Sequence, residues 1–404
     1  MKTFLLGAGA SKSYNQSPTG VKMPIARDFF QTFNSLNISS NPWVKIGDIV
    51  NYLRDNYGVS PTDFIYFNGD IEEIHSEIGE WLKQSILNVD DIDTILIHKL
   101  YMQLLFLFSS VINEIQNGPI SKPHINIAKI LTPDDCVITY NWDTLMDRAL
   151  NSTTKWKTDT GYLVKPKLIY KNRWESPVNY QEEFNDSPLL IKLHGSTNWL
   201  TSYMIIEEGE FTLTQENSSD VFYVYESTCE PYNTYDGRYM DGYQPFSYGY
   251  YPVNVPDKGK SVKEGYALIR MISRDPFTKK GGAGDSGLVS MPLIIPPVKN
   301  KAYFLFGGLF QRLWQYAEEA LSRAEHIIVI GYSFPNTDVQ SSLLFKNAFT
   351  KRKTYPYVTI LDPCPDRIYE KFKFDFGIPD THLSIFKEYF SENTPIEKLL
   401  SKTS

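Results

Sequence analysis

A glycine-rich turn near the N-terminus constrains the fold of this chain more than any other feature. The apolar residues 3–6 run directly into five small residues, Gly7, Ala8, Gly9, Ala10 and Ser11. In α/β proteins a strand that ends in such a turn cradles a nucleotide pyrophosphate. Glycines let the backbone approach the phosphates, and the amides of the following helix face the negative charge. The turn therefore predicts a nucleotide-binding α/β domain in which these five residues contact the phosphates.

The turn departs from GxGxxG, the dinucleotide fingerprint of common dehydrogenases. Its third glycine position is occupied by Lys12. That fingerprint also expects a second strand with an acidic residue at its end, about 20 positions further on. Here residues 23–30 read as the start of a helix instead. We therefore expect nucleotide binding in a manner different from that of the dehydrogenases.

Short runs of branched apolar residues, bounded by turn signals, recur along the chain. This pattern is typical of parallel strands that are covered on both faces. The expected strands are residues 4–7, 136–140, 189–193, 293–295, 326–330 and 358–361. We therefore predict an α/β fold, a Rossmann-like parallel sheet with helical and tyrosine-rich insertions, whose core spans residues 1–30, 130–200 and 290–370.

Two long segments interrupt this core. Residues 31–129 show helical spacing of apolar residues, for example Ile71, Ile74, Ile78, Trp81 and Leu82. Residues 201–289 are dense in tyrosine, glycine and proline. Because a structureless loop of that length is unusual, the segment is either an inserted subdomain packed on the core or a functional lid. Its tyrosines could also anchor a homo-oligomer interface.

Composition excludes several classes of protein. No apolar run approaches the ~20 residues that cross a bilayer, and the apolar stretch after Lys2 is too short for a signal peptide. Cys136, Cys229 and Cys364 are too few and too scattered for a disulfide framework or a four-cysteine zinc site. A formal charge of −7 argues against a general nucleic-acid binder. We expect a cytoplasmic protein with no membrane segment and no sequence-specific nucleic-acid binding.

Polar side chains follow two of the expected strands. Asn141 and Asp143 come after residues 136–140, and His194 follows residues 189–193. Ligands of open α/β sheets bind beyond the carboxyl ends of the strands, so these side chains are candidates for one site. Two alternatives remain open: Asn141 and Asp143 could simply cap the next helix, and His194 could be a packed histidine.

Taken in order and spacing, these motifs resemble those of the sirtuins. The turn 7–11 is similar to their GAG[IA]S loop, and residues 139–143 are similar to their TQNID motif. Residues 193–196 resemble the sirtuin motif whose histidine is the active-site base. Residues 331–333 resemble the G-[TY]-S turn that contacts phosphate and ribose, and Asp362 stands at the strand end that holds the adenosine ribose.

Departures from the sirtuin pattern show which group of sirtuin-like proteins this chain resembles. Tyr140 and Trp142 replace the glutamine and isoleucine of TQNID, and the interval that holds paired CxxC motifs in deacylases contains the single Cys229. Over the core, roughly residues 1–30, 130–200 and 290–370, the chain thus resembles the zinc-free sirtuin-like NAD hydrolases of bacterial antiphage defence. We expect residues 1–404 as a whole to form one NAD-binding domain. That resemblance implies NAD as substrate, no zinc, and a partner such as a HerA-type ATPase or a short Argonaute. Because uncontrolled NAD hydrolysis would kill the host, we also expect a restrained resting state, with the insertions covering the pocket or building a homo-oligomer.

The resemblance also implies roles for the candidate residues. Asn141 would orient the nicotinamide ribose and the attacking water, Asp143 would bind nicotinamide, and His194 would be the general base. The adenosine side would be held by Gly331, Ser333 and Asp362. The expected reaction is cleavage of the nicotinamide–ribose bond of NAD to nicotinamide and ADP-ribose. Two other functions remain possible from the sequence: a protein deacylase or ADP-ribosyltransferase, and a non-catalytic module that senses NAD or ADP-ribose.

Overall fold

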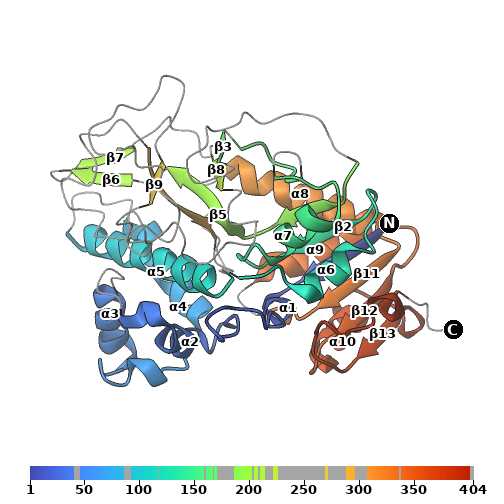
Figure 1. Ribbon diagram of the computed structural model, residues 1–404, viewed down its shortest axis with the longest axis horizontal. Coiled ribbons are helices and arrows are strands. Elements are labelled where there is room, and N and C mark those ends of the chain that lie inside the picture. The colour runs from blue at the N-terminus through green and yellow to red at the C-terminus, as the bar shows by residue number, and fades with distance from the viewer. Residues whose placement is uncertain are drawn as a thin grey trace.

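Six parallel strands form the central sheet of the molecule (Figure 1), in the order β13-β12-β11-β1-β2-β4. Their bounds are Lys2–Leu6 (β1), Cys136–Thr139 (β2), Leu189–Lys192 (β4), His326–Ile330 (β11), Tyr357–Leu361 (β12) and Leu383–Phe386 (β13). Every neighbouring pair runs parallel. The chain adds β2 and β4 on one side of β1 and β11 to β13 on the other. The predicted Rossmann-like α/β fold is therefore confirmed, with β1 at the point where the strand order reverses.

The computed structural model describes most of the core and part of the insertions. Described residues are 1–40, 46–85, 92–116, 118–158, 161–166, 168–170, 186–202, 204–207, 210–213, 222–225, 269–271, 288–295, 307–335 and 338–400. Most of the tyrosine-rich segment 201–289, including the tyrosines at 232–251 and Cys229, lies outside these residues.

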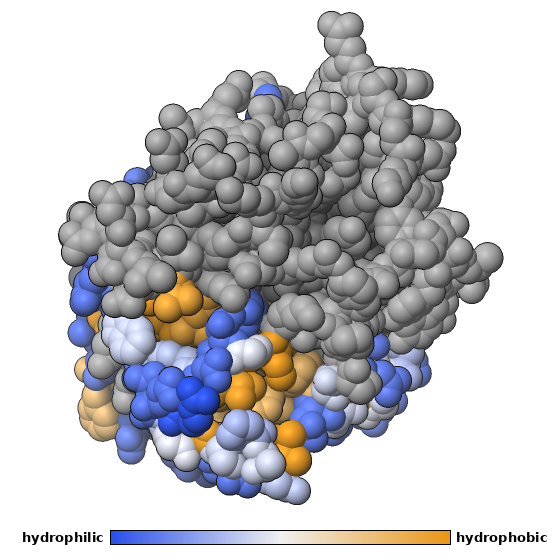
Figure 2. Space-filling model, turned by 90° about the vertical axis from the view of Figure 1, so that its left-hand side faces the viewer, coloured by the Kyte–Doolittle hydropathy of each residue, from blue (hydrophilic) through white to orange (hydrophobic). Residues whose placement is uncertain are grey.

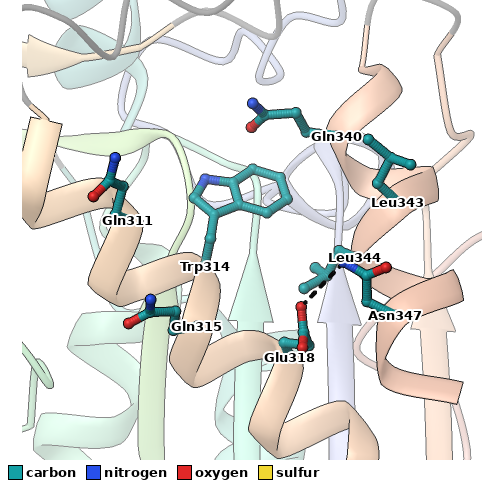
Figure 3. Close-up of a pocket in the computed structure, with 8 residues that line it drawn as sticks. All are labelled: Gln311, Trp314, Gln315, Glu318, Gln340, Leu343, Leu344 and Asn347. Atoms are coloured by element: carbon teal, nitrogen blue, oxygen red, sulfur yellow. Dashed lines mark hydrogen bonds between the residues drawn. The ribbon is translucent and has the colours of Figure 1, made fainter. Parts of the chain in front are cut away.

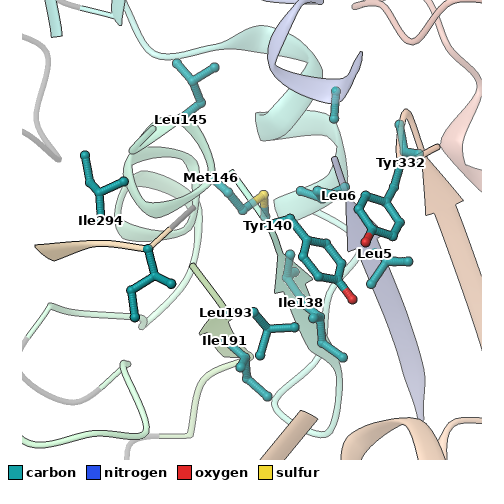
Figure 4. Packing of buried hydrophobic residues seen from close by; sticks show 14 of the residues in the cluster. Leu5, Leu6, Ile138, Tyr140, Leu145, Met146, Ile191, Leu193, Ile294 and Tyr332 are labelled. Atoms are coloured by element: carbon teal, nitrogen blue, oxygen red, sulfur yellow. The ribbon is translucent and has the colours of Figure 1, made fainter. Parts of the chain in front are cut away.

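The central strands are buried on both faces, which explains their apolar sequences. In β1, β2 and β11 nearly every side chain is covered, and Phe4, Val137 and Ile328 have no exposed surface. Figure 4 shows side chains of neighbouring strands, such as Leu5 and Ile138, close together in this core. Burial of such side chains on folding is the main favourable contribution to stability.

A second sheet continues from the first. Its order is β3-β8-β5-β10-β9, and its bounds are Leu168–Tyr170 (β3), Phe222–Tyr225 (β8), Gly195–Ser202 (β5), Leu288–Ile294 (β10) and Ile269–Met271 (β9). A separate hairpin joins β6 (Met204–Glu207) to β7 (Glu210–Leu213). The expectation that residues 293–295 belong to the parallel sheet was wrong, because Leu293 and Ile294 lie in β10, which pairs antiparallel with β5. A short apolar run does not reveal its strand partner.

Helices cover the sheets and fill the first insertion. Their bounds are Ala8–Ser11 (α1), Phe29–Ser35 (α2), Gly47–Tyr57 (α3), Ile71–Ser85 (α4), Ile92–Gln116 (α5), Lys122–Ala128 (α6), Leu145–Thr153 (α7), Gly307–Arg323 (α8), Val339–Thr350 (α9), Asp366–Glu370 (α10) and Ile396–Leu399 (α11). Single turns of other helix types span Asn37–Ser40 (η1), Phe64–Tyr66 (η2), Lys371–Asp375 (η6) and Asp380–His382 (η7). Helix α6 packs on α7, and α8 packs on α9.

All elements that the structure describes between residues 29 and 128 are helices, and most of them gather at the lower left of Figure 1. The predicted stripe on α4 is confirmed for Ile71, Ile74, Ile78 and Leu82, which are buried where α4 packs on α5, whereas Trp81 is 40% exposed. Figure 2 views this side of the molecule, where hydrophobic atoms are interspersed with hydrophilic ones. Within the described residues, no helix combines the length and the hydropathy needed to span a membrane.

Candidate active site

A cavity of about 500 Å³ lies at the carboxyl edge of the central sheet. The loops after β1, β2, β4, β11 and β12 all contribute to it, and the strand order reverses at β1, where ligands of open α/β sheets bind. Its wall includes eleven residues that follow these strands: Ala8, Gly9, Ser11, Asn141, Trp142, Asp143, His194, Gly331, Tyr332, Ser333 and Asp362. Of the predicted site residues, only Gly7 and Ala10 are absent from the wall.

The candidate residues follow the sheet in a fixed order along this edge. His194 follows β4, Asn141 and Asp143 follow β2, and the turn 7–11 follows β1. Gly331 and Ser333 then follow β11, and Asp362 follows β12. Neighbouring strands lie about 4.8 Å apart, so the ends of β4 and β12 are separated by about 19 Å. The cavity can therefore hold an elongated ligand with different groups at its two ends.

The glycine turn is bonded to the end of β11 through its backbone. The amide of Gly7 donates to the carbonyl of Ile330 (3.0 Å), and that of Gly9 donates to the carbonyl of Gly331 (2.9 Å). The amide of Ala10 donates to the Gly7 carbonyl (2.9 Å). These three amides are therefore already bonded within the protein. The parts of the turn that reach the cavity are Ala8, Gly9 and Ser11.

Gly331 is required by the close packing of these two turns. Its φ is +59°, and a Cβ atom there would stand 2.5 Å from the amide nitrogen of Ala10. No side chain fits at such a distance without movement of backbone. The glycine motif in the sequence thus reflects turn-to-turn packing as well as any ligand.

We expect Gly331→Ala to lower the free energy of unfolding by about 2–4 kcal/mol, the sum of a strained φ and a backbone clash. Chemical denaturation measures this. Gly377→Ala is the matched control, because Gly377 has a φ of +71° but nothing lies within 4 Å of the place that its Cβ would take. Equal losses in both variants would contradict the packing argument.

Asn141, Ser11 and Asp143 form a hydrogen-bonded chain at the cavity. The side-chain nitrogen of Asn141 donates to the Gly7 carbonyl (2.8 Å) and to Ser11 Oγ (2.7 Å). Ser11 Oγ donates to Asp143 Oδ2 (2.5 Å), while Asp143 Oδ1 accepts from the amide of Leu145 (2.9 Å). Asp143 therefore bonds the first amide of α7 but is not its N-cap residue, which is Thr144, and it also lines the cavity. Asn141 instead ties the loop after β2 to the turn after β1.

A buried ion pair lies directly behind this loop and was missed from the sequence. Lys192 Nζ lies 3.0 Å from Asp147 Oδ2, and the two side chains are 1% and 0% exposed. Lys192 also donates to the Asp143 carbonyl (2.6 Å), and the Tyr162 hydroxyl donates to Asp147. The available signal was a lysine at the end of an otherwise apolar strand, since an unpaired buried lysine is very costly.

His194 stands at the corner between the two sheets. The chain passes from β4 to β5 at this point, and the His194 carbonyl accepts a hydrogen bond from the amide of Ile295 after β10 (2.9 Å). The next residue, Gly195, has a φ of +77°, and a Cβ there would lie 1.9 Å from the Leu293 carbonyl oxygen. The His194 side chain is nearly buried but lines the cavity. The corner therefore fixes the backbone of His194 beside the cavity.

Two stacked tyrosines lie beside His194, one after β2 and one after β11. The rings of Tyr140 and Tyr332 lie 4.0 Å apart and within 3° of parallel, and Figure 4 shows them side by side. Tyr140 also meets His194 edge to face, with ring centroids 5.2 Å apart. Burial raises the pKa of both phenols well above the ordinary value. Both tyrosines are therefore neutral hydroxyls at physiological pH.

A buried carboxylate, Asp338, was also missed from the sequence. It lies at the start of α9, 1% exposed, with Oδ2 3.8 Å from His194 Nε2. The Tyr332 hydroxyl (2.6 Å) and Ser341 Oγ (2.5 Å) both donate to the same oxygen. An aspartate just before a helix usually signals no more than a cap, so its position beside His194 could be seen only in the fold.

The far end of the cavity is formed by the loop after β12. Asp362 lines it, and its Oδ1 atom accepts a hydrogen bond from the amide of Cys364 (2.8 Å). Partial burial raises the pKa of Asp362. Ser333 and Arg367 lie on the same wall. A carboxylate at the end of a strand in this position is suited to bind ribose hydroxyls.

A second cavity, of about 390 Å³, lies between α8 and α9 (Figure 3). Its wall consists of Gln311, Trp314, Gln315, Glu318, Gln340, Leu343, Leu344 and Asn347. Asn347 Nδ2 donates to Glu318 Oε2 across it (3.4 Å). It contains none of the predicted residues, and we assign the candidate active site to the larger cavity.

Within the described residues, no group of three or more His, Cys, Asp and Glu side chains is placed to hold a metal ion. Cys136 is buried in β2 and Cys364 is exposed.

The sequence matches no protein-family model and no curated protein. Among solved structures, the chain is similar to a Sir2 homologue in complex with NAD, at 12% identity and a TM-score of 0.40, covering 99% of this chain and 87% of the other. It is also similar to a Sir2 homologue in complex with ADP-ribose (12%, TM-score 0.36, 99% and 90% covered) and to a further Sir2 enzyme (16%, TM-score 0.34, 81% and 87% covered). At these values the likeness assigns no residue, and the site rests on its own geometry.

Proposed function

We propose that the protein is an NAD hydrolase that cleaves the nicotinamide–ribose bond and releases nicotinamide and ADP-ribose. One observation carries the proposal, namely the order of groups along the sheet edge. From β12 to β4 that order is a carboxylate, two glycine turns, an amide with a second carboxylate, and a histidine. NAD presents its parts in a matching order: adenosine ribose, pyrophosphate, nicotinamide ribose and the scissile bond.

Each group has a chemical task in this reaction. Asp362 and Ser333 bind the adenosine ribose, and Ala8, Gly9 and Ser11 contact the pyrophosphate. The side-chain amide of Asn141 donates its hydrogen bonds to the Gly7 carbonyl and to Ser11 Oγ. Its Oδ1 atom therefore orients the nicotinamide ribose and the water. Asp143, which lines the cavity beside Asn141, binds nicotinamide.

The step balances without any other reactant. Water attacks C1′ of the ribose, a C–O bond forms, and the C–N bond to the pyridinium breaks. The electron pair of that bond leaves with nicotinamide, which becomes neutral. His194 accepts the proton of the attacking water and later returns it to solvent.

The test is incubation of the purified protein with NAD, with nicotinamide and ADP-ribose separated by chromatography. Release of both in equal amounts supports the proposal. Formation of acyl-ADP-ribose only when an acylated peptide is added would indicate the deacylase alternative. Binding of NAD without turnover, with and without a partner, would indicate a sensing module.

We expect Asn141→Ala to reduce nicotinamide release about 100-fold or more, because even a displacement of about 1 Å in a positioned reactant has that effect. The matched control is Asn126→Ala. Asn126 also donates to a carbonyl, that of Glu392 (2.9 Å), but lies on α6 outside the cavity. Full turnover in folded Asn141→Ala would remove this residue from the mechanism.

The biological role follows as part of the same proposal. Unrestrained NAD hydrolysis would deplete the host cell, which suits an antiphage effector that acts by abortive infection. We propose control by homo-oligomerisation and by a separate partner, such as a HerA-type ATPase or a short Argonaute. If the isolated chain is inactive, the same assay with the product of a neighbouring gene tests this control.

A further inference from the structure

The strongest unexplained feature of the site is the fully buried carboxylate beside the histidine. Asp338 has an exposed fraction of 1% and His194 one of 2%, and Oδ2 and Nε2 are 3.8 Å apart. They come from elements far apart in the sequence, the end of β4 and the start of α9. A carboxylate so close to an imidazole, and so well shielded from water, interacts with it strongly.

Several hydrogen bonds hold the carboxylate of Asp338 in place. Its Oδ2 atom accepts from the Tyr332 hydroxyl and from Ser341 Oγ, and its Oδ1 atom accepts from the amide of Ser341 (3.3 Å). The start of α9 also places the positive end of a helix dipole at this carboxylate. Hydrogen bonds to the charged form of a carboxylate favour that form.

The aromatic side chains that the structure places against His194 carry no charge. Tyr140, at the end of β2, and Tyr332, at the end of β11, are held neutral by burial. The helix α8 contributes an uncharged ring, Trp314, whose centroid lies 6.3 Å from that of His194. Among the contacts of His194 with described residues, Asp338 supplies the negative charge, 3.8 Å from Nε2.

We propose that Asp338 is a positioning residue for His194, an inference that rests on the proposed hydrolase function. The carboxylate faces Nε2 at 3.8 Å and orients the imidazole by its charge. When the base accepts a proton from the attacking water, Asp338 stabilises the imidazolium that forms. Tyr332 and Ser341 in turn hold Asp338 in place, so the ends of β4, β11 and the start of α9 act together.

The test is Asp338→Asn, which removes the charge but preserves size and helix-capping ability. We expect nicotinamide release to fall by about 10- to 100-fold. Because the neutral form of His194 is active and the carboxylate favours its protonated form, the acidic limb of the rate profile should move to lower pH by about one unit. Asp338→Glu, which keeps the charge, should leave that limb near its original position.

The control is Asp135→Asn. Asp135 is also buried, and it accepts a hydrogen bond from the Lys2 amide (2.7 Å). It directly precedes β2, at the amino ends of the strands and so on the side away from the cavity. Its variant should lose stability without a shift of the rate profile. If Asp338→Asn does not fold, Asp338→Ser, another capping residue, takes its place.

A second readout separates this inference from the proposed function. The His194 ring is titrated by NMR in the full chain labelled with ¹⁵N-histidine, its signal identified by its absence in His194→Gln. A lower titration midpoint in the uncharged variant supports the pairing, even in a protein that does not cleave NAD. An unchanged midpoint in a folded variant overturns it, whatever the activity.

Discussion

Replacing His194 with alanine is expected to lower nicotinamide release by about 1,000-fold, within the range that a positioned general base contributes. His194 is the imidazole that lines the cavity beside Asn141 and Asp143, so the substitution removes the proposed base. Thermal unfolding should show a folded protein, since the His194 backbone is still held by the Ile295 amide. The assay is the chromatographic separation of nicotinamide and ADP-ribose.

The control for this variant is His326→Ala. His326 is the first residue of β11, so it lies at the amino end of the strand, away from the cavity. Its Nε2 atom lies within hydrogen-bond distance of Thr359 Oγ1 (2.8 Å). Its loss should affect stability more than turnover. Undiminished activity in a folded His194→Ala protein would contradict both the role of this histidine and the inference about Asp338.

The second large effect is on stability. We expect Lys192→Met to lower the free energy of unfolding by about 3–5 kcal/mol, because it leaves the charge of Asp147 buried without its partner. Lys192 also bonds the carbonyl of Asp143, so the loop that carries Asn141 should loosen and activity should fall with stability. Chemical denaturation and the NAD assay measure the two effects.

A double variant isolates the cause of that loss. In Lys192→Met with Asp147→Asn the uncompensated charge is gone, while an oxygen remains for the Tyr162 hydroxyl. We expect roughly half of the lost stability to return, because the main cost of breaking a buried pair is the charge left behind. If the double variant is no more stable than the single one, packing around Lys192 rather than charge explains the effect.

The amino-acid sequence was a good guide to local structure. Apolar runs predicted five of the six central strands to within a residue or two, because strands buried on both faces require such runs. The apolar runs did not predict β13, Leu383–Phe386, because its sequence includes Ser384 and its Ile385 is partly exposed. An edge strand is covered less completely, so its sequence carries a weaker signal.

The candidate site was predicted in part. Strand-end polar residues pointed to Asn141, Asp143 and His194, and all three line the cavity. The sequence could not show that Asn141 uses its amide hydrogens to tie two loops together, nor that Asp143 bonds both the first amide of α7 and Ser11. The contacts with the turn after β1 span more than 100 residues of chain, which no local pattern encodes.

The central strands, the glycine turn and the polar residues that follow the strands could all be read from the amino-acid sequence. Local sterics and burial set these features, and both leave periodic or positional signals. The folded chain was needed to show that Leu293 and Ile294 join a second, antiparallel pairing, that Lys192 pairs with Asp147, and that Asp338 stands beside His194. Such partners depend on the folded geometry, because a buried charge can be satisfied by any opposite group that the fold brings within reach.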